Sequence, residues 1–293
     1  MYYETIEKNN ITYSVDMLRL KTYISFSQFS EIEFRFKTVW SDYVKKYYNS
    51  SGISSFFYNY NIEVGEGQSF YFGFLHNNEK RTTLDSIKYN FTIEFNPNKL
   101  KDNKIILYLL SISGEWFLKS CDLAFDLPVN ILNIIYDKGK KRNVHIFSNG
   151  YDNKTICIGS KESDLFLKIY NKKIESNLNI LGDLTRIELT KKFEDFPIDN
   201  LKNLFISNDV FPVLYLNDYL YSLDTYKDKT MFAVLYAVQN GFDLNMLTRR
   251  YRQKIKELLE GGCKINFDKI STTQILRRII LKYFMNNSFV HFV

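Results

Sequence analysis

Cysteine and histidine are both scarce in this chain of 293 residues. Its three cysteines, Cys121, Cys157 and Cys263, are widely separated, and no two of them form a CxxC pair. This spacing argues against zinc fingers and against a disulfide framework, and it fits a reducing cytoplasm. The three histidines are also far apart, so a bound metal would be held mainly by carboxylates. Carboxylate oxygens suit hard cations, and we therefore expect Mg²⁺ or Mn²⁺.

Long apolar runs are missing as well. No stretch of about 18 uncharged apolar residues occurs, so the sequence predicts no membrane span. The first residues do not combine a basic segment with an apolar one, which predicts that there is no secretory signal peptide. We therefore expect a cytoplasmic protein.

Aromatic residues, in contrast, are plentiful, at 17% of the chain. Tyr, Phe, Asn, Ile and Lys are all abundant, as they are in proteins from AT-rich genomes, so we expect most rings in the core. A surface on which bases stack is the alternative. With 293 residues, 45% of them hydrophobic, the chain can bury a sizeable core.

The net charge of +6 is concentrated near the end of the chain. Residues 249–293 contain ten Lys or Arg residues and three acidic ones, whereas residues 1–248 are close to neutral. This asymmetry predicts a DNA-binding surface in the C-terminal part, with a solvated helix face as the alternative. The candidate DNA-binding residues there are Arg249, Arg250, Arg252, Lys254, Arg277 and Arg278.

Hydrophobic periodicity predicts strands in the first two thirds of the chain, flanked by helices at 27–48 and 103–112. After about residue 190 the apolar spacing becomes helical, at 231–240, 245–259 and 271–285, with Ser271 as the cap of the last helix. We therefore predict an α+β fold with a mainly antiparallel sheet in residues 1–195. Residues 196–293 are predicted to form a helical, basic region for DNA binding or dimerisation.

Three strand-like segments, 121–126, 165–170 and 184–189, each place polar groups on one face, because successive side chains of a strand point to opposite sides. If the strands share a sheet, carboxylates, a tyrosine and cations meet on that face. Such a set can hold a divalent metal and attack a phosphodiester. The outward side chains are those of Asp122 and Asp126, of Phe166, Lys168 and Tyr170, and of Arg186 and Glu188.

Tyr170 is the candidate nucleophile, because nearby cations favour a phenolate over a phenol of ordinary pKa near 10. Two residues four apart in a strand are separated by roughly 13 Å, so Asp122 and Asp126 are not expected to bind one metal together. Asp122 and Glu188 are preferred as metal ligands, because Asp126 precedes Leu127-Pro128 and is a candidate turn cap. The alternatives are a strand-end tyrosine with an exposed hydroxyl, and a cross-strand Arg186–Glu188 salt bridge of about 0–1 kcal/mol.

The segment 155–176 resembles the signature of the Rep_trans family, which contains rolling-circle replication initiators of Gram-positive plasmids and related relaxases of conjugative elements. It has the sequence IGS at 158–160 and KIYNKK at 168–173, and the family's nicking tyrosine falls on Tyr170. The sequences DLAFD at 122–126 and TRIEL at 185–189 match the family's two acidic strand motifs in the expected order. The resemblance runs from about residue 13 to residue 193.

The chain departs from the family pattern at three positions. Cys121 stands where an arginine is common, Cys157 where an aromatic residue is expected, and Lys168 where arginine is frequent. The lysine keeps the charge but loses the bidentate fork that an arginine presents to phosphate.

The resemblance implies a degenerate HUH-like nicking fold and a metal-dependent endonuclease that cuts one strand at a replication origin. Tyr170 would form a 5′-phosphotyrosyl link and leave a free 3′-hydroxyl. Mg²⁺ or Mn²⁺ would be held by Asp122 and Glu188, with Asp126 as a further candidate. Lys168 and Lys172 would stabilise charge near the tyrosine, whereas Arg186 and Lys173 are the candidate DNA contacts in this region.

The partners implied are origin DNA, a host helicase and a host DNA polymerase, with a homodimer as the assembly. A conjugative relaxase acting at an origin of transfer would use the same chemistry. A non-catalytic DNA-binding regulator of the same fold is the alternative from another class. The last alternative is an unrelated α+β binding protein whose resemblance to the family is accidental. In that case the three motif strands would not be neighbours in the sheet.

Overall fold

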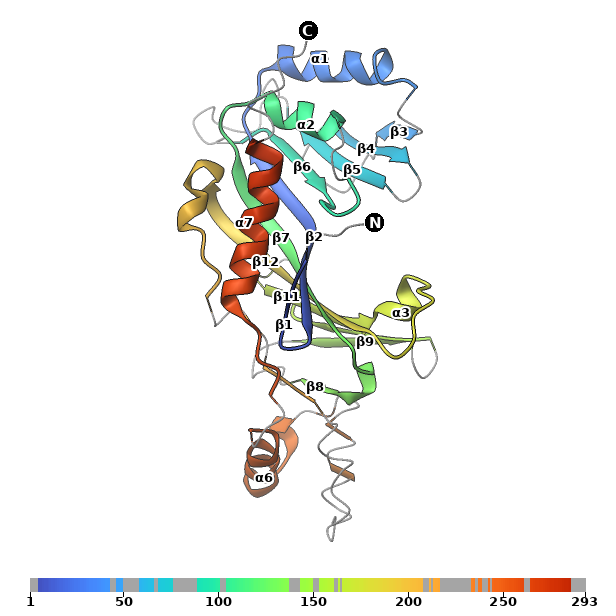
Figure 1. Ribbon diagram of the computed structural model, residues 1–293, viewed down its shortest axis with the longest axis vertical. Coiled ribbons are helices and arrows are strands. Elements are labelled where there is room, and N and C mark those ends of the chain that lie inside the picture. The colour runs from blue at the N-terminus through green and yellow to red at the C-terminus, as the bar shows by residue number, and fades with distance from the viewer. Residues whose placement is uncertain are drawn as a thin grey trace.

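Alternating apolar residues build one large antiparallel sheet, which helices flank (Figure 1). This confirms the predicted α+β class. The computed structural model describes residues 5–42, 46–49, 58–65, 68–75, 89–100, 104–136, 143–149, 153–160, 163, 165–207, 211, 213–216, 233–234, 237–238, 242, 244–260 and 264–285.

All strand pairings in the large sheet are antiparallel. A hairpin strand, β1 (Ile6–Lys8), pairs with β2 off the main path. A second, small sheet joins β8 (Ile134–Tyr136) to β13 (Leu214–Leu216). The order across the large sheet is β3 (Lys46–Asn49), β4 (Tyr58–Gly65), β5 (Gln68–Phe74), β6 (Phe91–Phe95), β2 (Ile11–Thr22), β7 (Phe117–Leu127), β12 (Thr185–Pro197), β11 (Leu165–Asn171), β10 (Lys154–Ile158) and β9 (Val144–Ser148).

Helix α1 (Phe26–Lys37) begins at a capping box in which Ser25 and Gln28 bond to each other's backbone. Its buried side chains, Phe29, Ile32 and Phe36, follow helical spacing. The predicted helix over 27–48 is therefore right for its first part. Its last part is wrong, because residues 46–49 form β3 and pair with β4.

The other helices match their predicted places. Helix α2 (Lys104–Ser111) buries four apolar residues, α6 (Arg249–Glu260) follows the short turn η5 (Leu244–Met246), and α7 (Lys269–Met285) comes last. The predicted cap Ser271 is wrong: the carboxylate of Asp268 accepts the backbone N–H of Ser271 at 3.0 Å and so caps α7. The helix predicted at 231–240 lies mostly outside the described residues.

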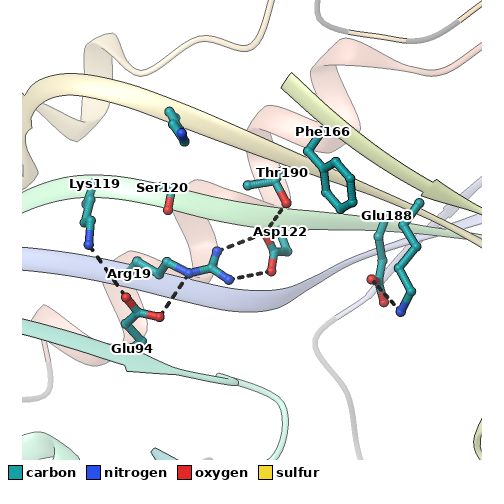
Figure 2. A pocket seen from close by; sticks show the side chains of 10 residues that line it. Arg19, Glu94, Lys119, Ser120, Asp122, Phe166, Glu188 and Thr190 are labelled. Carbon is teal, nitrogen blue, oxygen red and sulfur yellow. Dashed lines mark hydrogen bonds and ion pairs between the residues drawn. The ribbon is translucent and has the colours of Figure 1, made fainter. Parts of the chain in front are cut away.

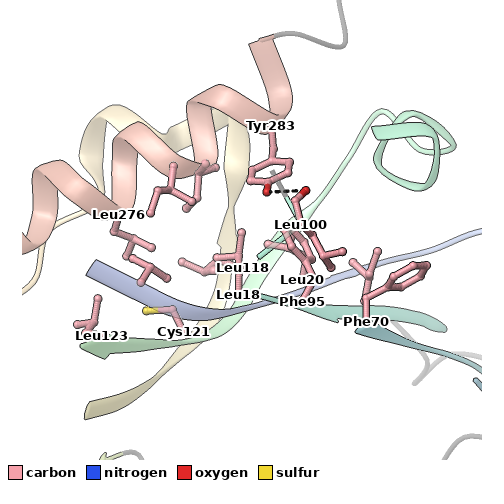
Figure 3. Packing of buried hydrophobic residues seen from close by; sticks show 14 of the residues in the cluster. Leu18, Leu20, Phe70, Phe95, Leu100, Leu118, Cys121, Leu123, Leu276 and Tyr283 are labelled. Atoms are coloured by element: carbon pink, nitrogen blue, oxygen red, sulfur yellow. Dashed lines mark hydrogen bonds between the residues drawn. The ribbon is translucent and has the colours of Figure 1, made fainter. Parts of the chain in front are cut away.

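Helix α7 is part of the main hydrophobic core (Figure 3). Its buried residues Leu276, Ile279 and Ile280 join the same cluster as Leu18 of β2 and Leu118 of β7. The hydroxyl of Tyr283 also donates a hydrogen bond of 2.9 Å to the carbonyl of Pro97. The predicted boundary at residue 195 falls inside β12, and α7 shares its core with the strands before that boundary.

The central strands therefore have one apolar face under α7 and one polar face opposite it. Leu123 and Phe125 of β7 are buried, as the alternation predicts, and Asp122 and Asp126 on either side of them point to the polar face. No helix among the described residues is long and apolar enough to cross a membrane.

Candidate active site

The polar residues of the three motif segments meet on neighbouring strands. β11 pairs with β12, and β12 pairs with β7. In one row across the sheet Tyr170 lies opposite Arg186, and Arg186 lies opposite Asp126; in the next, Lys168 lies opposite Glu188. The condition for an accidental resemblance, motif strands that lie apart, is therefore not met.

Tyr170 is enclosed by charged side chains. Its hydroxyl donates a hydrogen bond to Oε1 of Glu188, and only 3% of the residue is exposed. The ammonium of Lys168 lies 4.1 Å from the centre of the tyrosine ring and 3.7 Å from Oε2 of Glu188. The ammonium of Lys172 lies 5.7 Å from the same ring centre. The predicted nucleophile thus shares one site with a carboxylate and two cations.

The surroundings keep Tyr170 protonated. Burial raises the pKa of the Tyr170 hydroxyl far above its ordinary value, and the charge of Glu188 and the hydrogen bond to it raise it further. Arg186 acts in the opposite direction but does not reverse the shift. The expectation that cations favour the phenolate is therefore wrong for this state. A reaction at Tyr170 needs a base that takes the proton as the oxygen attacks.

Glu188 is placed to be that base. Burial raises the pKa of its carboxyl above the ordinary value, and the nearby charge of Asp16 adds to the rise. The hydrogen bond from Tyr170, together with the positive charge of Lys168, works against the shift. A carboxylate with a raised pKa accepts a proton more readily than an exposed one.

Arg186 is held between two aspartates. Its Nε and Nη2 donate to the two carboxylate oxygens of Asp126 at 2.5 and 2.6 Å, and its Nη1 donates to Asp16. The alternative interpretation, an Arg186–Glu188 salt bridge, is not among the ion pairs formed by the described residues, since Glu188 pairs with Lys168. Arg186 therefore fixes the frame around Tyr170 and has little freedom to contact DNA.

Asp16 is a site residue that the sequence patterns missed. It is the extra residue of a β-bulge in β2, because Val15 pairs with Leu123 and Met17 pairs with Asp122. A bulge re-aims the side chain at the irregularity, and here it directs Asp16 toward Arg186. The signal in the sequence is a change of phase, since the buried positions of β2 shift from Tyr13 and Val15 to Leu18 and Leu20.

Asp122 has a different set of partners. Both of its carboxylate oxygens accept from the guanidinium of Arg19, at 2.9 and 3.0 Å, and the hydroxyl of Thr190 donates to it at 2.7 Å. Arg19 also reaches Glu94 at 3.2 Å (Figure 2). The carboxylate predicted to be a metal ligand is thus neutralised by an arginine that the sequence patterns also missed.

The predicted metal set of Asp122, Asp126 and Glu188 is not assembled. Nowhere in the described ranges do three acidic, histidine or cysteine side chains form a group able to hold a metal. Asp122 and Asp126 each have a bidentate arginine partner. Glu188 is the acidic residue that is hydrogen-bonded to the tyrosine, and Asp16 is a second one, whose charge acts on Glu188. Two carboxylates suit Mg²⁺ or Mn²⁺, which usually take one or two carboxylates together with water and substrate phosphate.

Two further predicted residues belong to the short helix α3 (Lys172–Glu175), which starts directly after β11. Asn171 caps this helix by accepting the backbone N–H of Ile174 at 3.1 Å. Lys172 pairs with Glu175 at 2.8 Å, and Lys173 donates to the carbonyl of Gly182 at 2.9 Å. Lys173 is therefore tied to the chain that leads into β12.

The predicted DNA-binding residues near the C-terminus fall into two groups. Arg252 donates to the carbonyls of Asn245 and Leu247. Arg277 donates to the carbonyl of Lys202, in the last turn of the 3₁₀ helix η3 (Ile198–Asn203), and to that of Leu204, which follows it. These two arginines hold backbone in place. The exposed cations, free to meet phosphate, are Arg249, Arg250, Lys254 and Arg278.

Comparison with known proteins points to one class, proteins of replication initiation. A replication initiation protein from Staphylococcus aureus is 27% identical over 190 residues, which make up 60% of this chain and 56% of the relative. Another from the same organism is 30% identical over 129 residues, or 40% of this chain and 41% of the relative. This chain spans little more than half the length of the first curated relatives it matches.

A solved structure gives a more distant comparison. A rolling circle replication initiator protein from Geobacillus stearothermophilus aligns over 85% of this chain and 97% of its own, with a TM-score of 0.37 and 13% identity. No family model matches the chain, so membership of the Rep_trans family stays a prediction.

Proposed function

We propose that this chain initiates rolling-circle replication by nicking one DNA strand at an origin with Tyr170. The observation that carries the proposal is the hydrogen bond from the buried hydroxyl of Tyr170 to Glu188, inside a frame of cations. A nucleophile paired with a base, and a base oriented by further groups, is the arrangement expected for covalent catalysis. The similarity to replication initiation proteins supports origin DNA as the substrate.

The reaction starts with a proton transfer within the site. As the oxygen of Tyr170 forms a bond to phosphorus, its proton passes to Glu188. The bond between phosphorus and the 3′-oxygen breaks, and that oxygen takes up a proton from solvent. The products are a 5′-phosphotyrosyl link on the protein and a free 3′-hydroxyl on the DNA. A host DNA polymerase then extends this hydroxyl, and a host helicase unwinds the duplex.

Lys168 and Lys172 supply positive charge where the reacting phosphate must lie. Both ammonium groups lie over the tyrosine ring, so they also cover it. The contact between Lys168 and Glu188 is long, at 3.7 Å, and an entering phosphate can replace it. The lysines then stabilise the charge that develops on the phosphate. Arg186 stays bound to its aspartates and keeps β12 and its Glu188 in place.

Mg²⁺ or Mn²⁺ is part of the proposal. Glu188 would hold it through Oε2, because Oε1 accepts the hydrogen bond from Tyr170, and Asp16 would hold it through Oδ1, because Oδ2 accepts from Arg186. When bound, the ion supplies Lewis-acid polarisation of the scissile phosphate. The protein acts as a homodimer in this proposal, as implied by the resemblance.

The test is covalent capture on DNA that carries the flanking sequence of the protein's own gene. Supercoiled and single-stranded forms are incubated with Mn²⁺ and the wild type, Tyr170→Phe or Tyr108→Phe, and the products are separated on denaturing gels. Tyr108→Phe is the matched control, since the Tyr108 hydroxyl also donates to a carboxylate, Glu31, at 3.2 Å under the guanidinium of Arg35.

A protein–DNA adduct that requires metal, disappears in Tyr170→Phe and persists in Tyr108→Phe supports the proposal. An adduct that persists in Tyr170→Phe would move the nucleophile to another tyrosine. Specific binding without any adduct would favour a non-catalytic regulator.

A further inference from the structure

A polar groove lies on the same face of the sheet, beside the candidate active site (Figure 2). Its volume is about 400 Å³, and residues of five neighbouring strands line it, from β6 to β11. Lys168 and Glu188 belong both to the groove and to the surroundings of Tyr170. The groove therefore leads directly to the tyrosine site.

One wall of the groove is an aromatic ring. Phe166, Lys168 and Tyr170 are alternate residues of β11 and point to the same face. Phe166 is only half-buried and lies opposite Thr190, on the polar side rather than under α7. By the strand rise, its backbone is roughly 13 Å from that of Tyr170. An aromatic side chain on a polar face is placed for contact with a ligand rather than for the core.

The far end of the groove carries two further lysines, Lys119 and Lys192. Lys119 is the extra residue of a second β-bulge, because Ser120 pairs with Arg19 and Leu118 with Leu20. Its side chain is 43% exposed, and its ammonium is 3.7 Å from Glu94, a loose contact. The bulge thus turns a lysine into the groove that regular alternation would direct elsewhere.

The acidic residues of the groove are largely neutralised. Asp122 is bound through both oxygens by Arg19, and the same arginine reaches Glu94. These bonds fix the floor of the groove and remove most of the repulsion that a phosphate would meet there. The groove also carries the ammonium groups of Lys119, Lys168 and Lys192 along its length.

We propose that this groove seats an unpaired nucleotide of the DNA strand next to the scissile phosphate. The base stacks on Phe166, and the flanking phosphates bind Lys119 and Lys192. Stacking on an aromatic ring accepts any base, and it requires a base that is not already stacked in a duplex. The inference rests on the proposed function, because it takes the strand that Tyr170 attacks as its ligand.

The experiment measures non-covalent binding of a fluorescent single-stranded oligonucleotide and of its duplex, without metal, so that no nicking is needed. The variants are Phe166→Leu, Phe166→Trp and the double variant Lys119→Ala/Lys192→Ala. The matched controls are Phe34→Leu and Lys37→Ala on α1, where Phe34 is 61% exposed and Lys37 is exposed.

Phe166→Leu should weaken single-strand binding roughly 5- to 150-fold and leave duplex binding unchanged, whereas Phe166→Trp should retain affinity. The double lysine variant should lower the slope of log K against log salt by about 1.4, which is about 0.7 for each lost phosphate contact. Neither control should change either quantity. The loss of slope separates phosphate contacts from a general loss of folding.

Wild-type affinity in Phe166→Leu, or no single-strand binding by the wild type, would overturn the groove assignment. Equal losses for single strand and duplex would also overturn it. The covalent adduct assay with Tyr170→Phe is independent of these readouts. If the groove variants bind single strands like the wild type but the adduct still forms, the groove assignment is wrong and the nicking proposal stands. If single strands bind in the groove but no adduct forms, the nicking proposal is wrong.

Discussion

Two tyrosines of this protein have the same kinds of partner, but the pKa values of their glutamate partners are shifted in opposite directions. Tyr170 donates to Glu188 with Lys168 over its ring, and Tyr108 donates to Glu31 with Arg35 over its ring. The pKa of Glu31 is lowered, chiefly by its hydrogen bond from Arg35 at the surface, whereas burial raises the pKa of Glu188. Only the Glu188 pair therefore has a carboxylate inclined to take up a proton.

This contrast predicts different kinetic effects of two equivalent substitutions. Glu188→Gln should slow adduct formation by about 10²- to 10⁴-fold, because general-base catalysis is lost. Glu31→Gln should leave the rate unchanged. The measurement is the single-turnover rate of adduct formation at several Mn²⁺ concentrations. Full recovery of Glu188→Gln at high Mn²⁺ would show that Glu188 is only a metal ligand and not the base.

The same pair predicts opposite effects on stability in metal-free protein. A raised pKa means that the ionised form of Glu188 is disfavoured in the folded state, so stability is lost as pH rises through that raised pKa. Glu188→Gln cannot ionise, and its melting temperature should exceed that of the wild type at neutral pH. The gain should vanish as the pH falls below 4.5, the ordinary value for glutamate.

The pKa of Glu31 is shifted in the opposite direction, so its effect on stability has the opposite dependence on pH. Its lowered pKa stabilises the folded state above the ordinary pKa, and this contribution is lost as the pH falls through the lowered value. Glu31→Gln should therefore not be more stable than the wild type at neutral pH. Calorimetry with a chelator over this pH range checks both variants. A lower melting temperature of Glu188→Gln at neutral pH would contradict the assigned electrostatics.

At the scale of elements, strand alternation was enough to predict which of the motif side chains share the polar face. β7, β11 and β12 are regular over the motif positions, so a period of two placed Asp122, Lys168 and Glu188 on the correct face. It could not tell that Asp122 would be paired, because the partner Arg19 lies 103 residues away in the sequence. Contacts between residues so far apart in the sequence depend on the order of the strands in the sheet, which a single amino-acid sequence does not reveal.

The bulges mark where sequence reasoning failed. Asp16 and Lys119 each interrupt the regular pairing of β2 with β7, and a period of two extended through a bulge assigns the wrong face on one side of it. In β2 the apolar residues change from odd to even positions, which is consistent with a bulge. Only the pairing of β2 with β7 in the structure shows that a bulge is the cause. One bulge lies beside the candidate site and the other at the far end of the groove, and each brings a charged residue to the polar face of the sheet.

Helix α7 makes a prediction at the same scale. Ile279 is 1% exposed within the core, and its neighbour Arg278 points to solvent. Ile279→Ala should lower the free energy of unfolding by about 2–5 kcal/mol, whereas Arg278→Ala should change it by less than about 0.5 kcal/mol. Urea denaturation of the full chain measures both.

The consequence is that removing the residues after 245 would not test DNA binding by the basic region separately from the stability of the fold. Such a chain lacks α7 and exposes the apolar face of β2 and β7. An Ile279→Ala variant as stable as the wild type would show instead that the packing of Ile279 against the sheet contributes little to the stability of the fold.

At the scale of the whole molecule, the helix-covered core and the candidate site lie on opposite sides of the sheet. α7 covers one face, and the tyrosine site and the groove lie on the other. Helix α6 lies away from the large sheet, beyond β8 in Figure 1. With Arg249, Arg250 and Lys254 exposed, α6 is the part of the basic region that can approach duplex DNA without disturbing the core.

Salt dependence tests this division. Each phosphate contact to duplex DNA contributes about 0.9 to the slope of log K against log salt, because a counterion is released. Replacing Arg249, Arg250 and Lys254 by Ala should therefore reduce the slope for duplex DNA by up to about 2.7, with little change in stability. Arg252 is not included, since it holds the carbonyls of Asn245 and Leu247.

The groove variants provide the contrast. If α6 binds duplex and the groove binds the unpaired strand, the α6 triple variant loses duplex affinity and keeps its adduct yield on single-stranded DNA. The Lys119→Ala/Lys192→Ala variant shows the reverse pattern. An unchanged duplex slope in the triple variant would remove the DNA-binding role from α6 and leave its basic face as a solvated surface.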